Sequence, residues 1–395
     1  MAEAHSYSGL ESLPIFVQPL PDLRTYTVYC WFVLELPTSI TAAFMSAMDL
    51  WFVLGPTMFR WAPQQPSVFY FYPVMGNVVN GKVVPTIFST QDESVHEMMK
   101  RPIAQVYAMT NLKTYEPLVE STEAIFFSKL GNMADEGKSF DLGTWLHWFA
   151  TDVIMEITFG KRFGFLEREE DVDGIIQTIE ERFCWIISWC QQNVQAGSDS
   201  TAITLTAVIY HLLRNPDSME ILLTELDSAN LPSPVSWDVA HKLPYLDACI
   251  KEALRMNPAI GIPLERVAPA EGMEICGKYF KPGTVLGVNA WVVHNDNEVY
   301  GEDAPIWRPG RWVEASEDER KDMERTLFAF GGGSRICLGR NISYLEMYKV
   351  IPELLTRFKF ELKDPEKEWS LKNGFFVYTK GVEVTIHRRG TSGRR

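Results

Sequence analysis

The sequence lacks a long uncharged apolar run. Residues 25–59 are rich in apolar side chains, but acidic residues at 35 and 49 limit the longest charge-free run to residues 36–48. A membrane-spanning helix needs about 20 consecutive apolar residues. The N-terminus also shows no clean signal peptide. We therefore expect no simple transmembrane anchor, which leaves a buried apolar hairpin or contact with a membrane surface.

Cysteine is scarce, and none of the six cysteines forms a CxxC pair. This excludes a disulfide scaffold and favours a reducing compartment. We expect five of the six to be inert, buried thiols and the sixth, Cys337, to have a chemical role. The cysteines are Cys30, Cys184, Cys190, Cys249, Cys276 and Cys337.

Positive charge is also in deficit, since the formal net charge is -14. A uniformly acidic protein repels nucleic acid, so DNA and RNA are excluded as the main partner. Basic residues can still cluster locally and bind an acidic protein partner.

Helical spacing of apolar residues dominates beyond residue 66. The first 66 residues show no readable periodicity and are treated as a separate apolar segment, followed by one domain over 67–395. Asn-Pro pairs at 215 and 257 predict two helix ends. The expected helices cover residues 92–107, 115–130, 145–159, 171–187, 195–213, 244–256 and 340–358.

Strand-like segments are short and lie late in the chain. Residues 273–280 and 285–293, joined by a Lys-Pro-Gly turn, predict a hairpin-like pair. Residues 375–386 alternate as one strand, and a short strand is expected before the glycine-rich segment at 330. The predicted fold class is mainly α with small β-sheets.

The most informative string runs from Phe330 to Gly339 and reads FGGGSRICLG. Glycines let the backbone approach a flat ligand closely. The helix that follows would direct N–H groups and a favourable dipole at the Cys337 sulfur. Arg335 can reach an anionic ligand on the same side, and Phe330 can shield the sulfur from water. A buried structural cysteine is the main alternative, because a phosphate loop would need GxGxxG spacing or a Lys-Ser/Thr pair.

This string matches the haem-binding signature FxxGxRxCxG of the cytochrome P450 family at every fixed position, including Phe330, Gly333, Arg335, Cys337 and Gly339. The chain resembles that family over residues 67–386, and in particular it resembles the fungal pisatin demethylase and benzoate hydroxylase groups. The resemblance implies haem b, with Cys337 as the axial ligand of its iron.

The resemblance gives a structural role to an ExxR pair. Glu252 and Arg255 lie three residues apart, and in the family such a pair locks onto a later arginine, here Arg311. An ordinary surface ion pair is the alternative. The family usually has glutamate where Gly310 stands, so we expect a looser lock.

Residues 196–201 (AGSDST) read alone as an N-cap cluster that opens a helix. Beside the cysteine signature they resemble the oxygen-binding groove of the family's long central helix. Gly197 would then leave space for dioxygen. Asp199 with the hydroxyl of Ser200 or Thr201 would relay protons. The family usually has threonine where Ser200 stands.

Several cations are candidates for the haem propionates. His96, Lys100 and Arg101 occupy the position of a family helix that reaches a propionate, and Arg266 follows the ExxR helix. Solvated surface positions are the alternative for these basic residues.

One region departs from the family. Only residues 167–194 separate the FGF segment at 163–165 from the central-helix motif, where the family places several helices. We therefore expect part of the substrate roof and the first half of the central helix to be missing.

The resemblance implies a monooxygenase that acts on a small apolar or aromatic substrate, in fungal secondary metabolism. It also implies electrons from NADPH through a diflavin reductase, at the cytosolic face of the endoplasmic reticulum membrane. Ile260, Ile262, Phe375 and Phe376 could line the pocket. Two alternatives stay open: a reductase-independent isomerase or peroxygenase, and a remnant that binds haem poorly.

Overall fold

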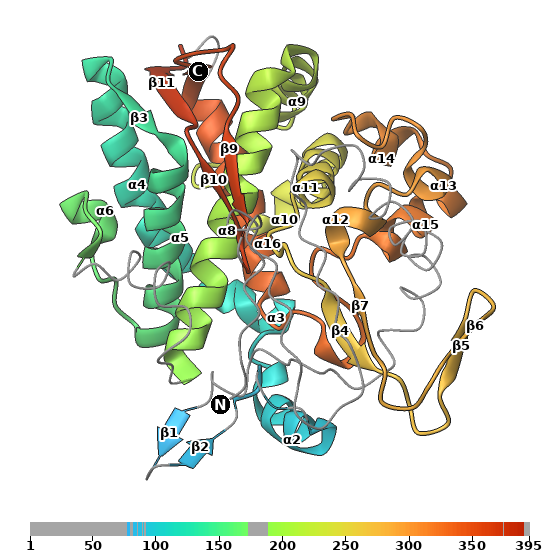
Figure 1. Ribbon diagram of the computed structural model, residues 1–395. Coiled ribbons are helices and arrows are strands. Elements are labelled where there is room, and N and C mark those ends of the chain that lie inside the picture. Colours follow the sequence, from blue (N-terminus) through green and yellow to red (C-terminus); the bar gives the residue numbers. More distant parts are fainter. Residues whose placement is uncertain are drawn as a thin grey trace, which may run out of the picture.

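The computed structural model describes residues 77–79, 82–84, 86–88, 90, 92–172, 189–373 and 375–390. The fold is mostly helical with small sheets, as predicted (Figure 1). The separate segment over 1–66 and nearly all of the predicted helix over 171–187 lie outside the described residues.

The helices over 93–104, 116–136, 142–159, 189–214, 244–256 and 340–357 agree with the expected ranges, whereas those over 216–228 and 317–326 were not expected. Asp141 caps the start of α5 by accepting from the Thr144 N–H, and Gly160 ends that helix in a left-handed conformation. The helices are α2 (Glu93–Ala104), α3 (Met109–Leu112), α4 (Glu116–Glu136), α5 (Leu142–Phe159), α6 (Phe165–Arg168), α8 (Trp189–Arg214), α9 (Pro216–Ser228), α10 (Trp237–Ala240), α11 (Pro244–Met256), α12 (Ala290–Val293), α13 (Asn297–Tyr300), α14 (Gly310–Glu314), α15 (Glu317–Thr326) and α16 (Arg340–Arg357), with 3-10 turns η3 (Lys113–Tyr115) and η5 (Gly333–Arg335).

The sheets are small and antiparallel. They pair β1 (Asn77–Val79) with β2 (Lys82–Val84), β4 (Leu264–Val267) with β7 (Val285–Val288), β5 (Met273–Ile275) with β6 (Lys278–Phe280) and β9 (Ser370–Asn373) with β10 (Val377–Lys380). A three-stranded sheet places β11 (Glu383–Arg388) between β3 (Ser139–Asp141) and β8 (Phe358–Leu362).

Three strand predictions are wrong. Residues 273–280 form a hairpin by themselves, because Cys276 and Gly277 both adopt positive φ angles and turn the chain. The segment after the Lys-Pro-Gly turn pairs instead with β4, and Asn289 caps a helix over its second half. The single strand over 375–386 divides at Gly381, whose φ is +88°. Helix α15, and no strand, precedes the glycine-rich segment.

The main core lies where α4, α5, α8, α11 and α16 pack together. Helix α8 is buried on all sides over residues 201–210, each of which is at most 6% exposed. Helices α4, α5 and α8 lie side by side, and β10 runs along α8 (Figure 1). This packing fixes the position of the central-helix motif.

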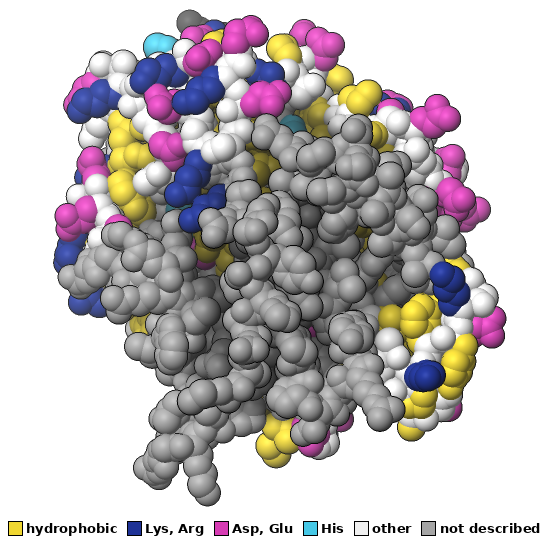
Figure 2. Space-filling model, viewed as in Figure 1, with side chains coloured by type: hydrophobic (Ala, Val, Ile, Leu, Met, Phe, Trp, Pro, Cys, Tyr) yellow, Lys and Arg dark blue, Asp and Glu magenta, His cyan; other side chains and the backbone are white. Residues whose placement is uncertain are grey.

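The surface mixes charges of both signs in the view of Figure 2, over the end of the molecule that holds β11. Ion pairs there join Arg388 to Asp135, Arg389 to Asp227 and Lys363 to Glu383. Such exposed pairs contribute little to stability individually.

Two acidic side chains are buried between α4 and α16. Glu123 and Glu346 are 2% and 1% exposed, and within the described residues neither oxygen of Glu123 has a hydrogen-bond partner. Burial raises the pKa of Glu123 to about 8, against the opposing charge of Lys349, whose Nζ lies 4.0 Å away.

We expect Glu123→Gln to stabilise the protein near pH 8. Between pH 4.5 and 8 the native state keeps a proton on Glu123. The unfolded chain, in which the carboxyl has its ordinary pKa of 4.5, has released that proton. Stability therefore falls as pH rises from about 4.5 to 8, by at most about 1.4 kcal/mol per pH unit. Urea unfolding at several pH values should show a flatter dependence for the variant. Glu136→Gln, an exposed change in the same helix, should keep the wild-type slope, and equal slopes for both variants would contradict the assignment.

Candidate functional site

The cysteine loop reverses direction twice before α16. Gly331 and Gly333 have φ angles of +67° and +69°, which other residues rarely adopt. The Cys337 N–H donates to the Phe330 carbonyl at 2.9 Å, which closes the loop, and the Phe330 ring packs against Tyr344. The Cys337 side chain stays exposed.

The surroundings of Cys337 suit a bound thiolate. Although solvent reaches the residue, the protein atoms packed around its sulfur raise the pKa of the thiol above the usual value. The backbone N–H groups of Gly339 and Arg340 oppose this, as do the charges of Arg340 and Lys100. These N–H groups stand at the start of α16, where the helix dipole favours negative charge. A metal cation at the sulfur would hold the thiolate form outright.

Cations converge beside the loop from three elements. Lys100 in α2 donates to the Ser334 carbonyl at 2.5 Å, and Arg335 Nε donates to Glu93 Oε1 at 2.7 Å. Leu264, at the start of β4, lies close to Gly331 and brings Arg266 into the cluster. His96 is buried in the same helix as Lys100.

This cluster carries more positive charge than Glu93, its carboxylate among the described residues, can neutralise. Burial, followed by the charge of Arg335, lowers the pKa of Arg266 to about 10 and that of Lys100 below its usual value. The same two causes lower the pKa of His96 to about 4, so its imidazole is neutral at pH 7.

Arg335 has unused hydrogen-bonding capacity. Both of its Nη atoms are buried without a partner in the described part of the chain. Buried donors are rarely left unpaired, so an anionic ligand with two carboxylates, as haem has, fits this cluster. Arg101 is exposed in the last turn of α2.

The central-helix motif lies inside α8, so it does not open a helix. The Ser200 hydroxyl donates to the Ala196 carbonyl at 2.6 Å, and Ala196 is exposed. Thr201 is buried and lies 3.2 Å from the Ser343 hydroxyl, six residues after Cys337. Ser200 therefore lies on a partly open face of α8, beside the end of α16 that carries the cysteine loop.

The predicted role of Gly197 is wrong. A Cβ at this position would lie 3.1 Å from Ile154 Cγ1, so the open side of the glycine faces α5. Gly197 allows the two helices to pack closely and does not widen the groove. Asp199 is 1% exposed, and its carboxylate is held between His147 and Tyr378.

The ExxR pair forms a complete buried lock. Arg255 binds both oxygens of Glu252 at 2.8 and 2.9 Å, and Arg311 Nε binds Glu252 Oε1 at 3.0 Å. Burial would raise the pKa of Glu252, but the two arginines hold it below its usual value. The lock is not loosened at Gly310, because Asp303 supplies a second carboxylate to Arg311 at 3.0 Å.

Sequence analysis missed a residue that joins this lock to the cysteine loop. His294 is fully buried; its Nδ1 lies 2.8 Å from the Arg255 carbonyl, and its Nε2 accepts from the Phe328 N–H at 2.7 Å. Burial lowers the pKa of His294 to about 3, so the ring is neutral and can accept this bond. No sequence signal marked His294, since its partners lie more than 30 residues away.

The cysteines differ in part from the expectation. Cys249 is buried, and burial raises the pKa of its thiol. Cys276 is exposed, because it occupies the tip of the β5–β6 hairpin. The side chains of Cys30, Cys184 and Cys190 lie outside the described residues.

Comparison with known proteins gives one consistent result. The family model described as Cytochrome P450 matches residues 85–195 and 186–386. The chain is 38% identical to cytochrome P450 monooxygenase cicH of Emericella nidulans, over 85% of this chain and 83% of that protein. It is 36% identical to a cytochrome P450 monooxygenase of Aspergillus terreus, over 73% and 76%.

A solved structure confirms the predicted fold class. The crystal structure of the cytochrome P450DA heme domain superposes with a TM-score of 0.71 at 15% identity, over 86% of this chain and 87% of that chain. At this identity the likeness concerns the fold alone.

The same comparisons bear on the shortened region. The two family-model matches meet at residues 186–195, within the segment where helices are expected to be missing. The alignment with cicH spans 414 positions, more than the 395 residues of this chain, although it covers only 85% of them. That relative therefore carries residues inside the aligned region that this chain lacks.

Proposed function

The chain belongs to the cytochrome P450 family of oxidoreductases, and from that premise we propose that it is a haem-thiolate monooxygenase with Cys337 as the axial ligand of the iron. The observation that carries the proposal is the pairing of an accessible thiol, faced by two backbone N–H groups, with a cation cluster in which both Nη atoms of Arg335 lack a partner among the described residues.

Haem would supply the activation of dioxygen, with the thiolate donating electron density that favours O–O cleavage. Arg335, Arg266, Lys100 and His96 would hold its propionates, and Phe330 would keep water from the sulfur. Ser200 holds its hydroxyl against the Ala196 carbonyl, poised to pass a proton. Asp199 is the acid that supplies it, and Thr201 fixes this turn of α8 against α16.

We extend the proposal to a small apolar or aromatic substrate in secondary metabolism. Phe376 bridges to Ile260 through the backbone, and Phe375 packs edge-on against Phe88 at 6.2 Å. This apolar group, together with Ile262, would line the substrate side. No polar recognition group stands out among these residues, so the shape of the site would decide specificity.

The electron donor in this proposal is an NADPH-dependent diflavin reductase. A hollow of about 490 Å³ lies beside the cysteine loop, lined by Phe330, Gly331 and Arg340 among others. Arg340 is exposed there and could attract an acidic partner. The proposed location is the cytosolic face of the endoplasmic reticulum membrane. Within the described residues, no helix has the length and apolar character to cross a membrane.

The test is the absorption spectrum of the reduced, carbon-monoxide-bound protein, expressed with a haem precursor. A strongly red-shifted Soret band is expected, because only a thiolate ligand produces it. Absence of haem, or a band typical of a neutral ligand, would overturn the proposal.

A second candidate is a haem-binding remnant that no longer holds substrate. The observation that favours it is that cicH carries residues inside the aligned region that this chain lacks, together with the short span of residues 167–194 where the substrate roof is expected. Titration of the haem-loaded protein with a panel of apolar aromatics separates the two. A spin-state change with any of them supports the monooxygenase, whereas none across the panel supports the remnant.

Arg335→Leu should weaken haem retention by roughly tenfold to a hundredfold. The change removes charge-assisted hydrogen bonds worth about 1.5–3 kcal/mol. The rate of haem transfer to apomyoglobin measures this loss. Arg388→Leu, which removes an exposed arginine paired with Asp135, is the control and should keep the wild-type rate. Equal rates for the two variants would remove Arg335 from the propionate site.

A further inference from the structure

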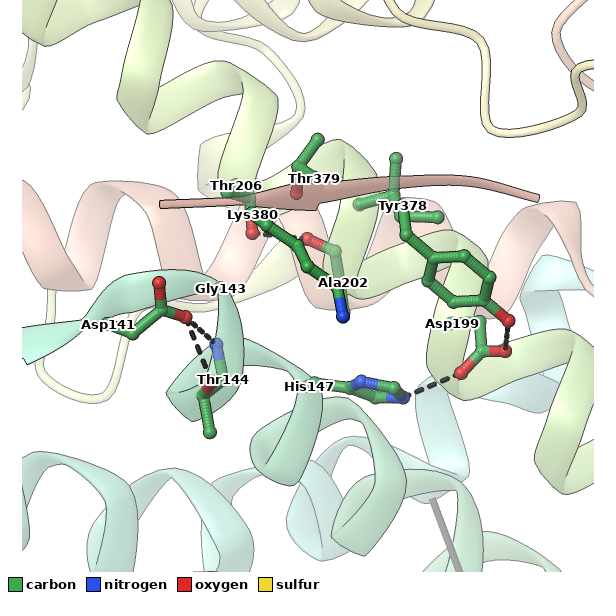
Figure 3. Close-up of a pocket in the computed structure, with 11 residues that line it drawn as sticks. Asp141, Gly143, Thr144, His147, Asp199, Ala202, Thr206, Tyr378, Thr379 and Lys380 are labelled. Carbon is green, nitrogen blue, oxygen red and sulfur yellow. Dashed lines mark hydrogen bonds and ion pairs between the residues drawn. The ribbon is translucent and has the colours of Figure 1, made fainter. Parts of the chain in front are cut away.

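Asp199 is connected to a part of the molecule that the proposed function leaves unused. Its Oδ1 lies 2.6 Å from His147 Nε2 of α5, and its Oδ2 accepts from the Tyr378 hydroxyl of β10 at 2.9 Å (Figure 3). His147 and Tyr378 come from two separate elements, α5 and β10, that both pack on α8, which carries Asp199. One carboxylate oxygen thus accepts a hydrogen bond from the Tyr378 hydroxyl, and the other lies in ion-pair contact with His147 Nε2, out of line for a hydrogen bond in this conformation.

His147 and Tyr378 border a polar hollow of about 240 Å³, which is roomy enough for several water molecules. The His147 side chain is 14% exposed, whereas Asp199 is 1% exposed, so the imidazole stands between solvent and the acid. The other lining residues are mostly small or polar: Asp141, Gly143, Thr144, Ala202, Ile203, Thr206, Thr379 and Lys380.

The hollow and the Ser200 hydroxyl lie on different sides of α8. Ser200 is on the face of Ala196, whose carbonyl it binds, while the Asp199 carboxylate points toward α5 and β10 (Figure 3). Successive residues of a helix differ by about 100° in direction. The Asp199 side chain would therefore have to swing by about 100° around α8 to carry a proton from the hollow to the Ser200 hydroxyl.

We infer that His147, assisted by Tyr378, is the proton inlet of this enzyme. A proton from water in the hollow binds His147 Nδ1 and Nε2 releases its proton to Asp199 Oδ1, which leaves the neutral ring in its other tautomer. The Asp199 side chain then turns away from His147 and gives this proton to the Ser200 hydroxyl oxygen as that hydroxyl releases its own proton on the side of Ala196, which restores both the carboxylate and the hydroxyl. Tyr378 holds the second carboxylate oxygen, so that Oδ1 faces the imidazole. This inference rests on the proposed function, since it supplies the protons that oxygen activation consumes.

The first test compares His147→Gln and Tyr378→Phe with Thr379→Val, a control that changes the lining of the same hollow. The reduced, carbon-monoxide-bound band should be unchanged in all three. Product formation should fall about tenfold or more in His147→Gln, with a larger solvent isotope effect and more hydrogen peroxide per NADPH. A smaller change in the same direction is expected for Tyr378→Phe. If His147→Gln matches the control, or loses haem in proportion to activity, its role is structural.

The second test needs no haem and no turnover. In protein with ¹⁵N-labelled histidine, the His147 Nε2–H proton should appear downfield, and saturation of the water signal should remove it because it exchanges with water in the hollow. In Asp199→Asn it should lose that downfield shift. A ring proton that exchanges as slowly as those of buried histidines would overturn the inlet. Should the wild-type chain bind no haem, the proposed function fails while this measurement still decides the inlet.

Discussion

Cys337→Ser should abolish the red-shifted band of the reduced, carbon-monoxide-bound protein while leaving the loop intact. Serine has nearly the shape of cysteine, so Gly331, Gly333 and the N–H groups that face the sulfur can keep their positions. Its alcohol, however, does not ionise near neutral pH and lacks the soft sulfur that binds haem iron strongly.

Cys276→Ser is the matched control for this change. Cys276 is also exposed but sits at the tip of the β5–β6 hairpin, away from the cysteine loop in sequence and structure. It should retain the full band and the wild-type haem content. A red-shifted band that survives in Cys337→Ser, or disappears in Cys276→Ser, would assign the ligand elsewhere.

Arg311→Ala should destabilise the protein by about 3–5 kcal/mol, or prevent folding. Removal of one member of a buried ion group leaves its partner charge uncompensated. Every nitrogen of the Arg311 guanidinium is used: Nε binds Glu252, and the two Nη atoms bind Asp303 and the carbonyls of Tyr300 and Ile306. Arg311→Lys keeps the charge but loses the planar set of guanidinium donors, so an intermediate loss of stability is expected.

Arg308→Ala provides the comparison, because it lies three residues earlier and also binds Asp303. Its side chain is 46% exposed, and such pairs are worth about 0–1 kcal/mol. Denaturant unfolding of the haem-free proteins should therefore separate the two variants by several kcal/mol. If Arg311→Ala and Arg308→Ala unfold at the same denaturant concentration, Arg311 does not lock this region. Since His294 joins the lock to Phe328, haem retention should fall together with stability in Arg311→Lys.

The cysteine loop could be predicted from the sequence because everything it needs is contiguous. The ligand, the glycines that permit positive φ angles and the start of α16 all lie between Phe330 and Arg340. The Glu252–Arg255 pair was readable for the same reason, as residues three apart share one face of a helix.

Strand pairing was harder to predict from the sequence, because short strands contain few positions at which apolar and polar residues alternate. The hairpin forms at Cys276 and Gly277 and not at the proline-glycine turn that follows. Each of its two strands has only three residues. At Gly381, one positive φ angle divided an alternating run into β10 and β11. Both outcomes depend on single backbone conformations that hydrophobic patterning does not report.

The sequence by itself determined the family and the fold class and singled out Cys337 as the proposed iron ligand, because local spacing encodes all three. Only the tertiary structure decided which side of α8 each motif residue faces. It turned Gly197 toward α5, left Ala196 exposed and placed Asp199 between His147 and Tyr378. Asp199 and Tyr378 are 179 residues apart, and their contact exists only because β10 packs along α8. Contacts over such separations follow from the packing of whole elements, which no short segment of sequence specifies.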